Sequence, residues 1–246
     1  MTSIHTFIIS WSGQHLNAEA IARAVHPASD AISMVYSDPD PQFCPNADCR
    51  LVRRPNHLFW GDKFEACLEF CTSDILLVIH ADCRCDDWSA LVFKCREALL
   101  AHSNIGVWAP LIDYTPWPLK DTQIGRLRNS NLNIVATTDA IVFAIRKDSR
   151  DRIKKAFIAE NIYGWGIDWM FTSYNYANKK IAVVDRSVAV THPRTRGYSS
   201  EQGTLQEKRF LETQLTLIEK IQYKLLWSYV INRQNQRSAN VSSAKP

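Results

Sequence analysis

An apolar run that ends in polar side chains is the first candidate for chemistry in this 246-residue chain. Residues 75–79 read Ile-Leu-Leu-Val-Ile, and His80 and Asp82 follow closely. A hard divalent cation that bridges two phosphates is normally held by one or two protein carboxylates, so Asp82 is a candidate cation ligand. The alternative is the solvated end of a strand. Asp86 and Asp87 are sufficiently explained as N-cap residues of a helix that begins just after them.

A second candidate is Asp168, which lies in the segment Gly164-Trp-Gly-Ile-Asp-Trp169. A carboxylate among apolar side chains needs a partner or a purpose. The two glycines allow close approach of the backbone, and Trp165 and Trp169 offer flat apolar surfaces on which sugar rings can pack. Core packing is the alternative. It is the favoured interpretation for Trp169, because a buried helix is predicted to begin there.

A third candidate is His192, which follows two apolar stretches of the chain. A lone histidine is more often a satisfied core residue than a ligand. Arg194 and Arg196 come directly after it, and two guanidinium groups at such a place suit recognition of a diphosphate. A solvated basic loop is the alternative for these arginines.

The elements that must position these groups alternate between strand and helix patterns, which predicts an α/β fold. Residues 75–79 suit a central parallel strand with helices on both faces. In doubly wound sheets ligands bind beyond the carboxyl ends of the strands, where the sequence places Ser10-Trp11, Asp38 and Asp82. The expected strands are 5–11, 31–36, 50–53, 75–79, 105–109, 140–145 and 181–184, and the expected helices are 17–25, 61–71, 88–101 and 152–158.

Over residues 5–200, these landmarks resemble, in their order, the GT-A nucleotide-sugar glycosyltransferases, and within them the members of glycosyltransferase family 2. The opening strand and Asp38 match the nucleotide-binding part of that family, and the run ending in Asp82 resembles its D-x-D motif. The segment around Asp168 resembles the later G-W-G-x-D/E-D element, and His192 resembles the downstream metal-binding histidine. The chain departs from the pattern at His80, which replaces the first acid of D-x-D, and at Ile167.

The resemblance implies a Rossmann-like domain with a central, mostly parallel sheet flanked by helices, and a C-terminal helical extension. It further implies a Mn2+ or Mg2+ cofactor held by Asp82 and His192, contact of Asp38 with the nucleoside, and Asp168 as the base if the transfer inverts the anomeric centre. The other residues expected to bind the nucleotide sugar are Ser10, Trp11, Lys63, His80, Arg194 and Arg196. Those expected to bind the acceptor sugar are Trp165, Gly166 and Trp169.

The expected function is therefore transfer of a hexose from a nucleoside-diphosphate sugar to a saccharide or lipid-linked acceptor, in bacterial surface polysaccharide synthesis. A nucleotidyltransferase is one alternative, but it would need a glycine-rich phosphate loop after the first strand, where residues 11–14 read Trp-Ser-Gly-Gln. A non-catalytic sugar- or nucleotide-binding module is the other. It gives no reason for His80, Asp82, Asp168 and His192 together.

Cysteine usage and the amino terminus predict a cytoplasmic protein. Seven cysteines are an odd number in a chain too large to need disulfides, which indicates free thiols. The first residues lack the cationic start and the apolar length of a signal peptide.

The net charge of +4 lies entirely in residues 203–246, which carry seven Lys or Arg against three Glu. A neutral body argues against a nucleic-acid partner. We expect residues 1–202 to form the GT-A domain and residues 203–246 a basic amphipathic helix with a polar tail. Its apolar stripe, with Trp227 and Tyr229 among cations, predicts packing on the domain, a homodimer contact, or peripheral binding to the inner face of an anionic membrane.

Overall fold

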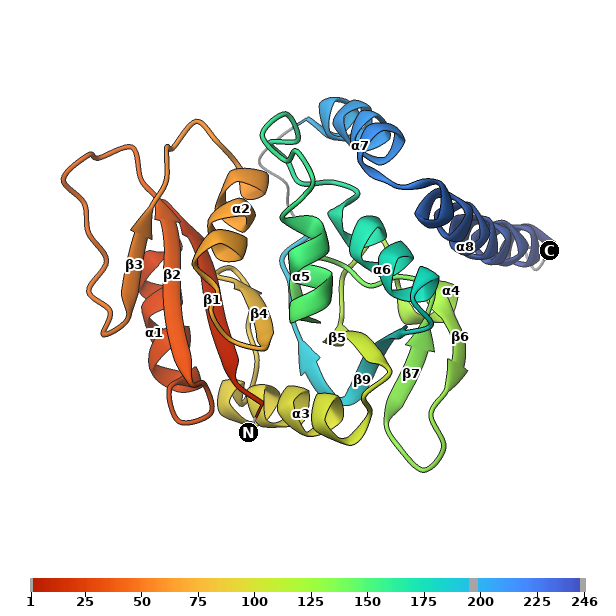
Figure 1. The fold of residues 1–246 in the computed structure, drawn as a ribbon, viewed down its shortest axis with the longest axis horizontal. Helices are drawn as coiled ribbons and strands as arrows, with labels where there is room; N and C mark the ends of the chain where they lie inside the picture. Colours follow the sequence, from red (N-terminus) through yellow and green to blue (C-terminus); the bar gives the residue numbers. More distant parts are fainter. Residues whose placement is uncertain (1, 195–198, 244–246) are drawn as a thin grey trace.

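The computed structural model describes residues 2–194 and 199–243, within which nine strands form a single sheet in the order β3-β2-β1-β4-β8-β5-β9-β7-β6 (Figure 1). The strands are β1 (Ile4–Trp11), β2 (Ala31–Ser37), β3 (Arg50–Arg53), β4 (Ile75–His80), β5 (Ile105–Ile112), β6 (Gln123–Arg126), β7 (Leu132–Val135), β8 (Val142–Arg146) and β9 (Ile181–Val190). The helices are α1 (His15–Val25), α2 (Trp60–Phe70), α3 (Trp88–Ala101), α4 (Leu119–Thr122), α5 (Lys147–Ile153), α6 (Ile167–Ala177), α7 (Ser200–Gln214) and α8 (Leu217–Ser243).

The sheet is mixed but mostly parallel, as the sequence predicts. Strands β3, β2, β1 and β4 are parallel to one another, and β5 is parallel to β9. Strand β8 is inserted antiparallel between β4 and β5, and β7 is antiparallel to both β9 and β6. The carboxyl ends of β1, β2 and β4 therefore meet at one edge of the sheet, which is where an open α/β sheet binds its ligands.

Helices cover both faces of the sheet, because β4 is apolar on both of its faces. Leu76 and Val78 pack in the cluster that includes buried side chains of α2, α6 and α8. Ile75, Leu77 and Ile79 pack in the opposite cluster, with α1 and α3. The predicted layered α/β architecture is therefore confirmed, with β4 as an inner strand of the sheet.

One expected helix is wrong in its bounds. The helix predicted over residues 152–158 runs instead from Lys147 to Ile153, directly after β8. Ile153 and Ile158 are both buried, and the chain between them turns rather than continuing as a helix. The spacing of Ile153 and Ile158 fits a helix that continues to Ile158 and also a helix that ends at Ile153, so the spacing alone does not decide where the helix ends.

The C-terminal extension is two helices rather than one. The first residue of the expected extension, Gly203, lies inside α7, and the helix breaks instead between α7 and α8. Thr216 and Glu219 form a reciprocal capping box there: the Glu219 carboxylate accepts from the Thr216 N–H at 2.7 Å, and the Thr216 hydroxyl accepts from the Glu219 N–H at 3.4 Å. A T-x-x-E signal at residues 216–219 marks this helix start in the sequence.

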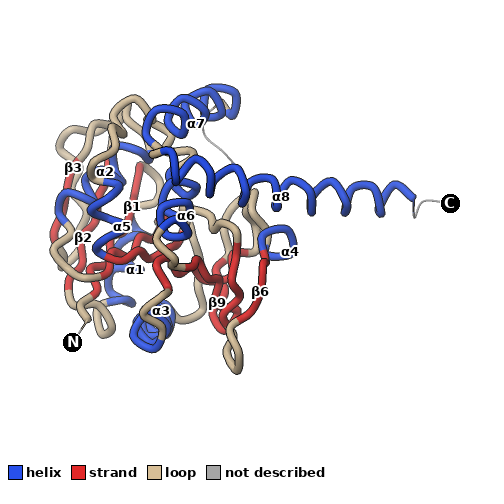
Figure 2. The backbone as a smooth tube through the Cα atoms, turned by 45° about the vertical axis from the view of Figure 1, so that its right-hand side comes forward, coloured by secondary structure: helices blue, strands red, loops and turns tan. Residues whose placement is uncertain are grey.

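Helix α8 packs on the domain with one face and then extends beyond its body (Figure 2). Leu226 and Val230 are buried in the same cluster as β1 and β4. Near its end, Arg237 pairs with the buried carboxylate of Asp121 at 2.9 Å. No helix among the described residues is both long and apolar enough to span a bilayer.

Candidate functional site

Three side chains that could bind a metal converge at the carboxyl edge of the sheet. His80 ends β4, Asp82 follows in the next turn, and His192 follows the bridge at the end of β9. Among the described residues these three form one group whose ligand atoms all lie within 4.8 Å of one another. The His192 Nε2 atom is 3.7 Å from an Asp82 carboxylate oxygen. Residues 112 positions apart thus share one site.

Backbone and side-chain hydrogen bonds fix the two segments that carry these residues. Arg84, two residues after Asp82, exchanges backbone hydrogen bonds with Thr191 at 2.9 and 2.8 Å. The Asp113 carboxylate accepts from the His192 N–H at 2.9 Å. On the other side, the Asn17 amide donates to the carbonyls of Ala81 and Cys83. The turn that carries Asp82 is therefore tied to the end of β9 and to α1, and the segment that carries His192 is tied to the end of β5.

The ring of His80 lies in an aromatic setting that keeps it neutral. Trp11 meets it edge-on with ring centroids 6.2 Å apart, and Trp60 is 5.9 Å away. Burial, together with His192 and Lys63, lowers the pKa of His80 to about 3. A neutral imidazole has a free lone pair, which is the form that binds metal.

The residues present fit a divalent cation. His80 Nε2 is buried and has no hydrogen-bond partner among the described residues, and the His192 nitrogen that faces Asp82 is Nε2. Buried polar atoms are nearly always paired, so an unpartnered nitrogen needs an explanation. Burial raises the pKa of Asp82, although His192 opposes this, and a cation would remove that penalty. Nitrogen and carboxylate donors together suit Mn2+, and the carboxylate suits Mg2+.

The part of the site expected to bind the nucleotide sugar contains Ser10 and Asp38, and a third residue connects these two. His15, at the start of α1, bonds Ser10 Oγ through Nδ1 at 2.9 Å and Asp38 Oδ2 through Nε2 at 3.0 Å. Burial opposes ionisation of Asp38, but hydrogen bonds from Asp40 N–H, His15 and Ser12 hold the pKa of Asp38 below its ordinary value. The structure therefore brings the ends of β1 and β2 together, as the sequence predicts.

The expected basic groups lie in different environments. Lys63 on α2 is buried, and its ammonium donates to the carbonyls of Leu58 and Phe59 at 3.1 and 3.4 Å. Burial, partly opposed by Asp62, lowers its pKa to about 8. Arg194 is exposed and its guanidinium lies 5.4 Å from the Tyr114 ring centre. Arg196 lies outside the described residues.

Asp168 is nearly buried in the first turn of α6, and both of its carboxylate oxygens accept hydrogen bonds. Trp117 Nε1 donates to Oδ2 and the Trp169 N–H donates to Oδ1, each at 2.9 Å. Burial, with the nearby carboxylates of Glu207 and Asp139, raises the pKa of Asp168 well above its ordinary value. A carboxylate in such a setting takes up a proton readily, as a general base must.

The expected sugar-binding residues need correction. Trp169 is fully buried against Trp117 and Trp227, so it is a packing residue and offers no face to a sugar. Gly166 has a left-handed φ of 84°, and a Cβ there would lie 3.1 Å from side-chain atoms of Glu207 and Leu211. Its hydrogen side chain thus permits the approach of α7 rather than that of a ligand.

Trp165 is half-buried, and part of its ring is covered by α7. A Cβ on Gly203 would lie only 2.9 Å from Trp165 ring atoms, which shows how closely the helix backbone approaches the indole. Glycine is therefore required at both positions 166 and 203 for the same reason: a side chain at either position would separate α7 from the G-W-G segment.

Four residues of the site were missed by sequence reasoning: His15, Asp113, Asp139 and Glu207. Asp113 follows β5 directly, so the rule that singles out Asp38 would have found it had the strand been predicted to its true end. Asp139 accepts from Thr115 Oγ1 at 2.7 Å. Its charge raises the pKa of both Cys83 and Asp168, each after burial as the largest cause, so it lies near both of these residues.

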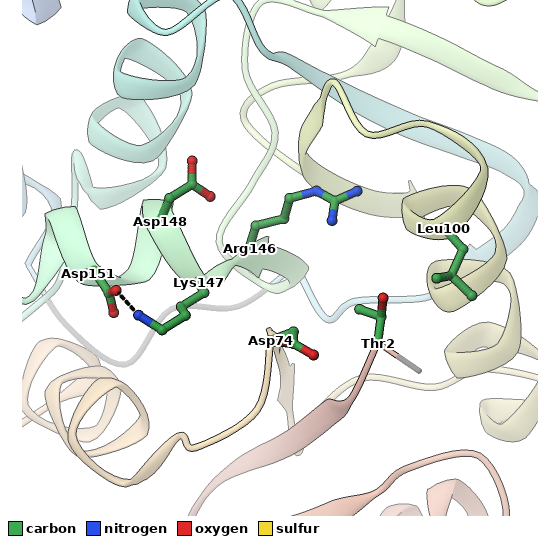
Figure 3. A pocket seen from close by; sticks show the side chains of 7 residues that line it. All are labelled: Thr2, Asp74, Leu100, Arg146, Lys147, Asp148 and Asp151. Atoms are coloured by element: carbon green, nitrogen blue, oxygen red, sulfur yellow. Dashed lines mark hydrogen bonds and ion pairs between the residues drawn. The ribbon is translucent and has the colours of Figure 1, made fainter.

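Two surface hollows lie away from this site. One, of about 710 Å³, is at the opposite edge of the sheet and is lined by charged residues such as Arg146, Lys147 and Asp151 (Figure 3). The other, of about 260 Å³, lies between α7 and the segment around Phe157. The chemistry-bearing groups lie at the carboxyl edge, so we place the site there and not in either hollow.

No family model matches the sequence, and no curated protein matches it by sequence. The fold, however, is similar to that of solved glycosyltransferases. GalNAc-T7, solved with UDP, GalNAc and Mn2+, has a TM-score of 0.62 and 11% identity, over 91% of this chain and 50% of that chain. The mannosyltransferase PcManGT from Pyrobaculum calidifontis, solved with GDP-Man and Mn2+, has a TM-score of 0.56 and 12% identity, over 100% and 76%.

Glucosyl-3-phosphoglycerate synthase from Mycobacterium tuberculosis, solved with Mg2+ and UDP, has a TM-score of 0.58 and 12% identity, over 87% and 79% of the two chains. This chain spans half the length of GalNAc-T7. At these identities the likeness establishes the fold, which is the GT-A fold of nucleotide-sugar glycosyltransferases. The neighbours were solved with Mn2+ or Mg2+, in agreement with a divalent cation cofactor.

Proposed function

We propose that this protein is a metal-dependent glycosyltransferase that moves a sugar from a nucleoside-diphosphate donor to a hydroxyl acceptor. The observation that carries the proposal is the group His80, Asp82 and His192, with the unpartnered buried Nε2 of His80, at the carboxyl edge of a GT-A sheet. A binding module has no need of a cation site beside a buried, hydrogen-bonded carboxylate such as Asp168.

The residues of the site divide the reaction between them. His80, Asp82 and His192 would hold the cation, which would neutralise the charge of the departing diphosphate. Asp38 would bind the nucleoside. In an inverting transfer, the acceptor oxygen attacks the anomeric carbon, the bond to the diphosphate breaks, and Asp168 takes the acceptor proton. In a retaining transfer Asp168 would instead orient the acceptor.

Nucleotide release from a panel of UDP-, GDP- and CMP-sugars, with Mn2+, with Mg2+ and with chelator, tests the proposal. We expect one nucleotide sugar to be consumed only when a divalent cation is present, with release of the nucleoside diphosphate. Pyrophosphate release from a nucleoside triphosphate and a sugar phosphate would indicate a nucleotidyltransferase instead. Binding of a nucleotide sugar without turnover, with simple sugars and lipid-linked saccharides supplied as acceptors, would indicate a binding module.

For the acceptor, we propose a saccharide or a lipid-linked glycan, with bacterial surface polysaccharide synthesis as the setting. The support is an analogy at the level of the fold. The neighbours differ in the compounds that they bind: glucosyl-3-phosphoglycerate synthase was solved with phosphoglyceric acid. The same panel with neutral and phosphorylated acceptors separates these classes.

We also propose that α8 binds an anionic membrane surface, but not through Trp227 and Tyr229. Trp227 packs on Trp117 and Trp169, and the Tyr229 hydroxyl donates to the Gln123 carbonyl, so neither serves as an interfacial anchor here. The exposed apolar side chains are on another face of the helix. They are Leu217, Ile218, Ile221 and Leu225, with 74, 62, 50 and 61% of their area exposed.

These four residues recur at helical spacing, and Lys224 is exposed among them. An apolar stripe with a cation beside it suits the headgroup region of an anionic bilayer. Flotation with phosphatidylcholine vesicles, with and without phosphatidylglycerol, tests the proposal. We expect binding to the anionic vesicles alone and its loss in Leu217→Gln/Ile221→Gln/Leu225→Gln, but not in Leu205→Gln on α7. Binding that is unchanged in the triple variant would refute it.

A further inference from the structure

A chain of three side chains connects β1, α1 and β2 in the part of the site expected to bind the nucleotide sugar. Ser10 Oγ bonds His15 Nδ1 at 2.9 Å, and His15 Nε2 bonds Asp38 Oδ2 at 3.0 Å. Ser10 is fully buried, His15 is 7% exposed, and the Asp38 side chain is 8% exposed. Because Ser10 has no exposed surface, its hydroxyl cannot act as a nucleophile, and these three hydrogen-bonded side chains must have another purpose.

The chemistry of the three groups fixes which of them donates and which accepts in each hydrogen bond. An ionised carboxylate only accepts, so the His15 Nε2–H must donate to Asp38. In the neutral ring this leaves Nδ1 as an acceptor, which the Ser10 hydroxyl satisfies. The ring cannot turn freely, because it stacks on Phe43 with centroids 4.4 Å apart and meets the edge of Tyr36 at 6.0 Å.

The carboxylate of Asp38 is held from both sides. The Asp40 N–H donates to Oδ1 at 2.8 Å, and His15 holds Oδ2. Ser12 is a third donor, so three of the roughly four acceptor sites of the carboxylate are used and the group can still accept one hydrogen bond from an N–H of a base or an O–H of a ribose. Without His15, the carboxylate would retain its contacts with Asp40 and Ser12 and the turn that carries it.

We propose that His15 is a positioning residue for the donor nucleoside, which holds Asp38 as an oriented hydrogen-bond acceptor for the nucleotide. The inference rests on the proposed function, since it requires a nucleoside diphosphate at the end of β2. Ser10 acts through His15, because its hydrogen bond to Nδ1 fixes which ring nitrogen of His15 carries the proton.

Calorimetric titration of UDP and of GDP in the presence of Mn2+ tests this role. His15→Phe keeps an aromatic ring against Phe43 but removes both hydrogen bonds, whereas His15→Gln keeps a donor for Asp38. Hydrogen bonds to charged groups contribute about 1.5–3 kcal/mol, so we expect His15→Phe to weaken the Kd by roughly 10- to 100-fold. His15→Gln should restore most of the affinity. His26→Phe, at an exposed position just after α1, is the matched control.

A double-mutant cycle makes the test specific. In an Asp38→Asn background, His15→Phe should cause little further loss of affinity, because the two residues act through one contact. A 2′-deoxy nucleotide identifies the group that Asp38 binds: the effect of His15→Phe persists if it is a base N–H and disappears if it is the 2′-hydroxyl. Wild-type affinity in a folded His15→Phe, or additive losses in the cycle, would overturn the inference. Wild-type protein that binds no nucleotide would refute the proposed function itself.

Discussion

Glu207 on α7 carries a stability cost that should appear only as the pH rises. Its side chain is half-buried over the turn at Gly166, close enough to Asp168 to raise the pKa of that residue. Burial raises the pKa of Glu207 itself from 4.5 to about 7. Below pH 4.5 the folded and unfolded chains both hold the proton. Between these values the unfolded chain ionises first, so the free energy of unfolding falls as the pH rises.

The size of the effect follows from the same pKa values. Each pH unit corresponds to ~1.4 kcal/mol, so the interval from 4.5 to about 7 sets an upper limit of roughly 3.4 kcal/mol. Part of the side chain meets solvent, so we expect about 1–2 kcal/mol. Glu207→Gln should therefore be more stable than wild type above pH 7 by that amount, or by roughly 2–8 °C in Tm, and this advantage should shrink as the pH falls toward 4.5.

Urea unfolding in the presence of chelator, at half-unit steps from about pH 5 to 8.5, measures the effect. Glu212→Gln, on the exposed side of the same helix, is the matched control and should show no such pH dependence. The reasoning fails if the stability difference between Glu207→Gln and wild type is the same at every pH, because a pH-independent difference reports packing and not ionisation.

Three further predictions concern the cation, the base and the tail. With Mn2+ at 100 times its Kd, the free energy of unfolding of wild type should rise by about 2.7 kcal/mol, or roughly 5–11 °C in Tm. Asp82→Asn should lose both this shift and turnover, whereas Asp86→Asn, at an exposed position, should keep both. Asp168→Asn should lower kcat by about 100- to 10,000-fold with little change in donor KM, and a raised KM at normal kcat would contradict the assignment. Arg237→Gln leaves the carboxylate of Asp121, 2% exposed, without its cation, and should cost about 1–2 kcal/mol in urea unfolding. Equal stability of Arg237→Gln and wild type would count against that contact.

Local patterns in the sequence predict the layers and seven of the nine strands in the described part of the chain, because nearby residues decide these, whereas the short strands β6 and β7 were not predicted. The run from Ile75 to Ile79 requires apolar partners on both faces, and this makes β4 an inner strand of the sheet. The turn that carries Asp82 then follows from the end of that strand. What a single sequence leaves open is pairing over distance, such as that of Asp82 with His192, which here depends on the resemblance to a known fold.

The missed residues share a physical reason. His15 belongs to the site only because β2 brings Asp38 beside the first turn of α1, and the Glu207–Asp168 proximity exists only because Gly166 lets α7 approach. Neither contact leaves a periodic pattern. Trp169 shows the reverse case. An aromatic residue beside a candidate base looks suited to sugar binding, but its ring is buried and packs against the rings of Trp117, Tyr223 and Trp227.

The surroundings of Asp168 extend into the C-terminal helices. Asp168 accepts from Trp117, and Trp117 packs against Trp169 and against Trp227 of α8. Glu207 approaches the same carboxylate from α7. Contacts therefore cross the expected boundary at residue 202, and the surroundings of the candidate base are built partly from the extension. Deleting the tail would expose this aromatic cluster and disturb Asp168, so a loss of membrane binding in a truncated chain could not be separated from a loss of folding. Substitutions confined to the exposed stripe of α8 leave these contacts in place, which is why they are the proper test of a surface role for this helix.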